Sequence, residues 1–288
     1  MSMYSAGRCV LLASAITVCM SACALAPVAE PQGSSNASKA AQIGRTMGRF
    51  TYTDTPVDVK LGPSIFRIPA NYLDSQIAPW PGEGVSLVIE WPDMVATAPG
   101  ARAHPRTNDF RREIRISVDY IDRVPIEKLL ERRASNESIT EPGSLERNDP
   151  RDRLDLRLAQ PEVMGLTPYA VDEGKMPQFV DLYTAKFGRP PPRSRLSEND
   201  WYVARSPDGR IATFIKCDSV AYVKDGVRLE GRDIVNVPDE IPIAGCNHYI
   251  VDIENSLAIT LSYYRVFLKD WKRMEVATRE LLERSKAG

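Results

Sequence analysis

Few residues in this sequence have side chains typical of enzyme chemistry. Its 288 residues include two histidines, His104 and His248, and five cysteines. A serine hydrolase would have to use one of these histidines as its base. His104 lies in a polar loop next to a proline, where we expect it to be solvated. His248 begins an expected strand, where we expect it to make a structural hydrogen bond.

The common catalytic motifs are also missing from the sequence. It has no Gly-x-Ser-x-Gly, no His-Glu-x-x-His, no P-loop and no Gly-x-Gly-x-x-Gly. We therefore predict a protein that is not an enzyme and that has no cofactor and no metal site. Two alternatives stay open. A glycosidase can use two carboxylates that lie far apart in the chain, and Trp80 and Trp91 could form a glycan-binding face, although core packing explains both more simply.

The N-terminus has the pattern of an exported lipoprotein. Arg8 ends a short positive start, residues 9–20 are apolar, and the small residues Ser21-Ala22 precede Cys23. This order is typical of a secretory signal, and a run of roughly 12 apolar residues is too short to span a bilayer as a stable helix. We predict a signal peptide over residues 1–22 and lipid attachment at Cys23.

The residues that follow refine this prediction. Ala24-Leu25-Ala26 also fits an ordinary cleavage site, but Pro27 would make a poor substrate after the cut. Ala24, rather than aspartate, follows the lipidated cysteine, which favours the outer membrane over the inner one. Residues 23–45 are rich in Ala, Pro, Ser and Gly, so we expect a flexible tether. The sequence therefore predicts a periplasmic protein held on a membrane by lipid.

Two cysteines remain when the signal is removed and Cys23 is lipidated. They are Cys217 and Cys246, and the periplasm oxidises thiols. We predict that these two cysteines form a disulfide. Free thiols are one alternative, and a metal site shared with His248 is another, although the spacing matches no zinc pattern.

Composition limits the partners of the mature chain. The net charge is −1, and no basic stripe or Lys/Arg-rich run with interleaved aromatics occurs. We therefore expect no nucleic-acid partner. A chain of about 266 residues after signal removal is long enough for a sizeable core.

Alternation of apolar and polar residues predicts strands along most of the chain. Residues 114–120 are the clearest case, with Ile114, Ile116 and Val118 on one face. The other expected strands are residues 57–61, 65–68, 86–91, 153–158, 179–183, 201–205, 211–216, 248–253 and 257–264, with weak pairing near 227–237.

Two helices are expected, at residues 126–133 and 266–284. The second has apolar residues at three- and four-residue steps, so it should pack on the sheet. We expect a solvated loop at 134–150 and an extended linker at 188–193. The prediction is an α+β fold of mainly antiparallel sheets with a long C-terminal amphipathic helix packed on the sheet. It forms a single domain over residues 46–288, with two lobes dividing near 140–150 as the alternative.

Several short segments resemble a known family. They are Phe66–Tyr72, Glu90–Met94, Pro242–Tyr249, Ile259–Arg265 and Leu268–Trp271. In these segments the chain resembles bacterial lipoproteins that act as type VI secretion immunity proteins and neutralise lipase effectors. The segments touch both ends of the mature chain but cover a minority of it, and the charged middle has no match.

The resemblance implies a periplasmic protein that binds and inhibits a toxic effector, with a phospholipase as the effector. The loop at 134–150 and the linker around Pro190 could supply contacts to it. The alternative is an envelope structural or ligand-binding lipoprotein with no toxin partner.

Overall fold

The computed structural model describes residues 41–82, 84–103, 109–135, 141, 143–241 and 243–287. The expected signal peptide, Cys23 and His104 lie outside these described residues. The described residues belong to one compact unit.

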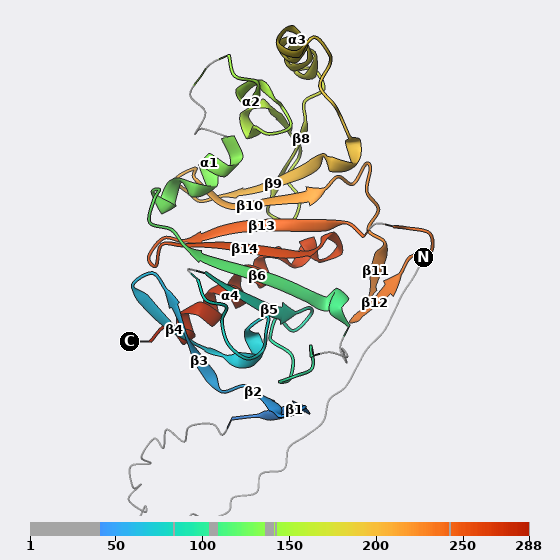
Figure 1. Ribbon diagram of the computed structural model, residues 1–288. Helices are drawn as coiled ribbons and strands as arrows, with labels where there is room; N and C mark the ends of the chain where they lie inside the picture. Colours follow the sequence, from blue (N-terminus) through green and yellow to red (C-terminus); the bar gives the residue numbers. More distant parts are fainter. Residues whose placement is uncertain are drawn as a thin grey trace, which may run out of the picture. The chain divides into compact units, whose positions relative to one another are not determined.

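An eight-stranded antiparallel sheet forms the centre of this unit (Figure 1). Strands from both sides of residues 140–150 join it. In spatial order the strands are β5 (Gly84–Glu90), β6 (Glu113–Tyr120), β14 (Leu257–Tyr264), β13 (Gly245–Asp252), β10 (Ile211–Asp218), β9 (Asn199–Arg205), β8 (Thr167–Val171) and β7 (Arg157–Ala159).

Three two-stranded hairpins lie outside the central sheet. They are β1 (Ile43–Met47) with β2 (Phe50–Thr53), β3 (Pro56–Leu61) with β4 (Ser64–Pro69), and β11 (Val227–Glu230) with β12 (Asp233–Asn236). The expected tether therefore ends earlier than residue 45. Residues 43–45 belong to β1, where the Arg45 amide donates to the Pro99 carbonyl at 3.2 Å.

The described residues also contain four α-helices and six short 3-10 helices. The α-helices are α1 (Leu129–Ser135), α2 (Leu145–Asn148), α3 (Met176–Phe187) and α4 (Trp271–Ser285). The 3-10 helices are Ala70–Tyr72, Phe110–Arg112, Ile126–Lys128, Leu154–Leu156, Arg195–Ser197 and Arg265–Asp270.

The strand expected at residues 179–183 is wrong, because these residues lie within α3. Phe179, Tyr183 and Phe187 are four residues apart, and their rings contact in sequence at 6.1 and 4.6 Å between centroids. Such spacing stacks side chains along one side of a helix. Gly188 ends the helix in the left-handed conformation at φ 68°, which glycine adopts without a steric penalty.

Two other expectations need smaller corrections. Of residues 153–158, only Arg157 and Leu158 belong to a strand, and Leu154–Leu156 forms a 3-10 turn. The loop expected at 134–150 contains α2, whose first turn is capped by the Ser144 hydroxyl.

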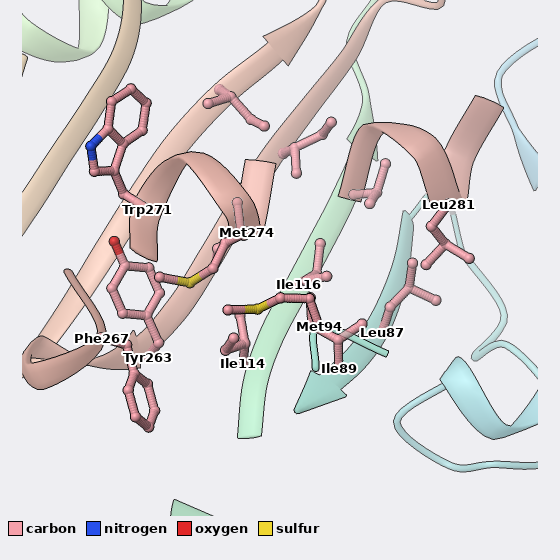
Figure 2. Close-up of a cluster of buried hydrophobic side chains, with 14 of the residues drawn as sticks. Leu87, Ile89, Met94, Ile114, Ile116, Tyr263, Phe267, Trp271, Met274 and Leu281 are labelled. Atoms are coloured by element: carbon pink, nitrogen blue, oxygen red, sulfur yellow. The ribbon is translucent and has the colours of Figure 1, made fainter. Parts of the chain in front are cut away.

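Helix α4 and one face of the sheet form the main core (Figure 2). Trp271, Met274 and Leu281 of the helix point toward sheet residues such as Ile116 and Tyr263. All five side chains are at least nine-tenths buried. Fully burying one large apolar side chain contributes about 1.5–3 kcal/mol. These contacts confirm the expected packing of the C-terminal helix on the sheet. Its first turns, Arg265–Asp270, are 3-10 rather than α-helical.

Cys217 and Cys246 form a disulfide within this core. They are direct cross-strand partners on β10 and β13, with Cα atoms 4.0 Å apart. Both side chains are buried on the sheet face that α4 covers. The expected disulfide is thus present, and it joins the C-terminal hairpin to β10.

Reducing this disulfide should lower the free energy of unfolding by about 3 kcal/mol, because the unfolded chain loses a closed loop of about 30 residues. Urea unfolding of the oxidised and reduced protein measures the difference. The Cys217→Ala/Cys246→Ala double variant is the control and should show no response to reductant. Equal midpoints for oxidised and reduced protein would contradict the prediction.

Candidate functional site

His248 lies in a buried hydrogen-bond network between β13 and α4. Its Nε2 is 2.8 Å from Glu275 Oε1, and its Nδ1 is 3.4 Å from the Tyr263 hydroxyl. The Thr213 hydroxyl donates to the same Glu275 oxygen at 2.6 Å. Burial raises the pKa of Tyr263 well above its ordinary value, so its hydroxyl stays protonated. These contacts confirm that His248 makes the expected structural hydrogen bond. Because the side chain is 0% exposed, a substrate could not reach the ring.

The two tryptophans considered for glycan binding do not share a face. Trp91 is 4% exposed, stacks on Phe267 at 5.1 Å between ring centroids, and donates from Nε1 to Asp270 at 2.9 Å. Trp80 is 71% exposed. The core packing expected for both tryptophans is therefore confirmed for Trp91 and wrong for Trp80.

The two segments expected to supply contacts meet beside Arg151. Its guanidinium pairs with Asp149 at 2.6 Å and donates to the Pro192 carbonyl at 3.4 Å. Arg151 also lines a hollow at the β7–β9 end of the sheet.

The sheet face opposite α4 is only partly covered. At one end, Leu130, Ala134 and Leu154 pack against Trp201 and Phe214 and form a second, smaller core. Over β6, β14 and β13, the same face carries polar or charged side chains. These include Arg115, Ser117, Thr260, Ser262 and Asn247. We call this uncovered part the open face.

Four residues form a line across the open face. Arg115, Ser262, Asn247 and Lys216 are direct cross-strand partners on β6, β14, β13 and β10. Directly opposed residues point to the same side of a sheet and lie close enough to interact. The Ser262 hydroxyl donates to Asn247 Oδ1 at 2.8 Å. We call these four residues the polar row.

A hollow of about 380 Å³ lies over the polar row, and all four residues of the row line this hollow. A second hollow of about 230 Å³ also contains Lys216, and a third of about 140 Å³ also contains Arg115 and Ser262. Gly245 leaves the first hollow open, because a Cβ there would have no neighbour nearer than 3.6 Å. The polar row thus runs beneath a series of adjoining hollows.

Lys216 is the most unusual group in these hollows. Its Nζ lies 4.2 Å from the centroid of the Trp201 ring, which is its cross-strand partner on β9. The Arg157 guanidinium lies 3.9 Å from the same ring. Aromatic faces attract cations, so the indole holds two positive groups. Within the described ranges, neither Lys216 nor Arg157 forms an ion pair.

The burial of these two cations has an electrostatic consequence. Desolvation lowers the pKa of Lys216 to about 8 and that of Arg157 to about 10. Arg157 is stabilised by donating to the carbonyls of Tyr169, Asn199 and Arg151 at 2.6–3.2 Å. The Lys216 side chain has no hydrogen bond to any described residue. The site is therefore suited to bind a negatively charged group.

Comparison with solved structures assigns the chain to a family of secretion-system immunity proteins. The chain is similar to the structure of Smlt3025, an immunity protein of the Stenotrophomonas maltophilia type IV secretion system. The two are 63% identical, the match covers 86% of this chain and 99% of that chain, and the TM-score is 0.82. At this identity and coverage, the chain belongs to the family of Smlt3025. No protein-family model and no curated protein matches the sequence.

The comparison supports part of the family resemblance seen in the sequence. An immunity protein was expected, and the relative is one. The expected secretion system was type VI, whereas the relative is an immunity protein of a type IV system. The comparison does not test the expected lipase effector. Among the described residues, no helix is long and apolar enough to cross a membrane, and no three His, Cys, Asp or Glu side chains are grouped to hold a metal ion.

Glu275→Ala should lower the free energy of unfolding by about 1–3 kcal/mol, because His248 and Thr213 would lose their shared acceptor inside the protein. Urea unfolding measures the change. Glu280→Ala, on the exposed side of the same helix, is the matched control and should change stability by less than about 0.5 kcal/mol. Equal effects of the two substitutions would contradict a structural role for the network.

Proposed function

We propose that this protein is an immunity protein that binds and neutralises a toxic effector of a type IV secretion system. The observation that carries the proposal is the 63% identity to Smlt3025 over 99% of that chain. The rigid core supports it, because a surface that is already ordered loses less entropy when a partner binds. The full burial of His248 also fits a protein that acts by binding rather than by catalysis.

We also propose that the protein acts in the periplasm from a lipid anchor at Cys23. The support is the N-terminal pattern of a positive start, an apolar run and small residues before that cysteine. The absence of aspartate after Cys23 favours the outer membrane. Residues between Cys23 and β1 would then let the folded part reach an effector near the membrane.

A phospholipase is our proposal for the effector's activity. Its support is the resemblance of segments such as Phe66–Tyr72 and Leu268–Trp271 to lipase-immunity proteins. A lipid anchor would also hold the inhibitor next to the substrate of such an effector. The type of secretion system is taken from Smlt3025, because that match covers far more of the chain.

Co-expression tests the immunity function. The candidate effector is the toxin encoded beside the gene for this chain, exported to the periplasm of a susceptible bacterium. Cells that also make this protein should survive, because the effector is bound before it acts. A form lacking residues 1–22 should not protect, because it stays in the cytoplasm. Equal killing with and without the full-length protein would refute the proposed function.

Membrane fractionation tests the anchor. Cys23→Ser should remove the protein from the detergent-soluble membrane fraction, because no lipid can be attached. Cys9→Ser, a cysteine substitution within the expected signal, is the matched control and should leave the protein in the membrane. Membrane attachment of the Cys23→Ser protein equal to that of the wild type would show that the anchor lies elsewhere.

A further inference from the structure

Lys216 forms no ion pair within the described residues, although Glu113 and Asp218 line the same hollow and Asp152 and Glu198 line the adjoining one. On the sheet face opposite α4, its cross-strand partners are Trp201 on one side and Asn247 on the other. Asp152 acts on it only at longer range, and Arg157 and Arg133 oppose its charge from β7 and α1. Arg115, the other cation of the polar row, is 3.3 Å from Glu113. Lys216 is therefore the cation of the row that has no ion pair among the described residues.

A half-buried cation without an anion is unfavourable for the free protein. Removal from water costs free energy, and the face of Trp201 returns only part of it. A carboxylate entering the hollow would offset the rest, because ion pairs strengthen where water is excluded. The free protein is therefore better matched to an acidic partner than to an uncharged one.

The hollow also has the surroundings of a protein contact. Its lining includes Tyr264 and the 54% exposed Phe110. Aromatic side chains beside a desolvated charge are typical of residues that dominate protein–protein binding. In contrast, the groove along α4, lined by Met94, Lys272 and Val276, presents no buried unpaired charge among the described residues.

We propose that the hollow over the polar row is the surface that binds the effector, and that an Asp or Glu side chain of the effector pairs there with Lys216. The inference rests on the proposed immunity function and identifies its contact surface. It predicts that the effector presents an acidic segment to β10, β13 and β14.

Two substitutions test this from opposite directions. Lys216→Met removes the cation but keeps a long apolar side chain over Trp201. Asn247→Asp keeps the cation and supplies a cross-strand carboxylate of nearly the same shape. Lys216→Met should weaken binding of the adjacently encoded effector by at least about tenfold, because one member of a desolvated ion pair is lost. Asn247→Asp should also weaken binding, because the new carboxylate would compete with the carboxylate of the effector for Lys216. Isothermal titration calorimetry with the purified effector measures the dissociation constants.

Lys272→Met on α4 and Lys60→Met on β3 are matched controls, since both lysines are exposed. They should bind within about twofold of the wild type. Thermal unfolding of all four variants confirms that each is folded. Wild-type affinity in both Lys216→Met and Asn247→Asp would overturn this inference and leave the immunity function intact. Loss of binding in Lys272→Met alone would instead place the contact on α4. A wild-type protein that neither binds the effector nor protects would refute the proposed function itself.

The pH dependence of binding gives a second readout. A bound carboxylate favours protonated Lys216, so its pKa should be higher in the complex than the value of about 8 in the free protein. Binding should then be at full strength below pH 7 and should weaken as pH rises above 8. Lys216→Met should remove this part of the pH profile, and identical profiles for the two proteins would contradict the ion pair.

Discussion

The burial of one face of the central sheet beneath α4 is the constraint on which the rest of the structure depends. Every second residue is apolar or buried on that face from Ile114 to Val118, from Cys246 to Ile250 and from Leu257 to Tyr263, so the helix has a continuous surface to cover. The disulfide and the His248–Glu275 contact lie in the same layer. Both connect elements that the apolar contacts already bring together, and they fix the register of β10 against β13 and the position of α4.

Because α4 covers only one face of the sheet, the opposite face is buried at one end and uncovered at the other. The smaller core around Trp201 and Phe214 covers one end, while the polar row crosses the uncovered part. Lys216 lies at the boundary between them, where the edge of the small core dehydrates it and supplies an aromatic face. A charged group held in this way on a rigid sheet suits an inhibitor, because little reordering is needed when a partner binds.

The sequence predicts the elements better than it predicts the site. Alternation located the strands that form most of the sheet, and the spacing from Trp271 to Leu282 located the final helix. The prediction for residues 179–183 was wrong because five mostly apolar residues, interrupted only by Asp181, fit either a strand or a helix. The polar row could not be predicted, because Arg115, Lys216, Asn247 and Ser262 come from four strands whose order and register depend on tertiary pairing.

Lysine footprinting of the protein with and without its effector tests the central claim most directly. An amine-acetylating reagent modifies accessible lysines, and mass spectrometry measures the rate at each position. The effector should slow acetylation of Lys216 strongly and should leave acetylation of Lys60 and Lys272, on other surfaces, unchanged. Acetylation of Lys216 at the same rate in the complex as in the free protein would contradict it.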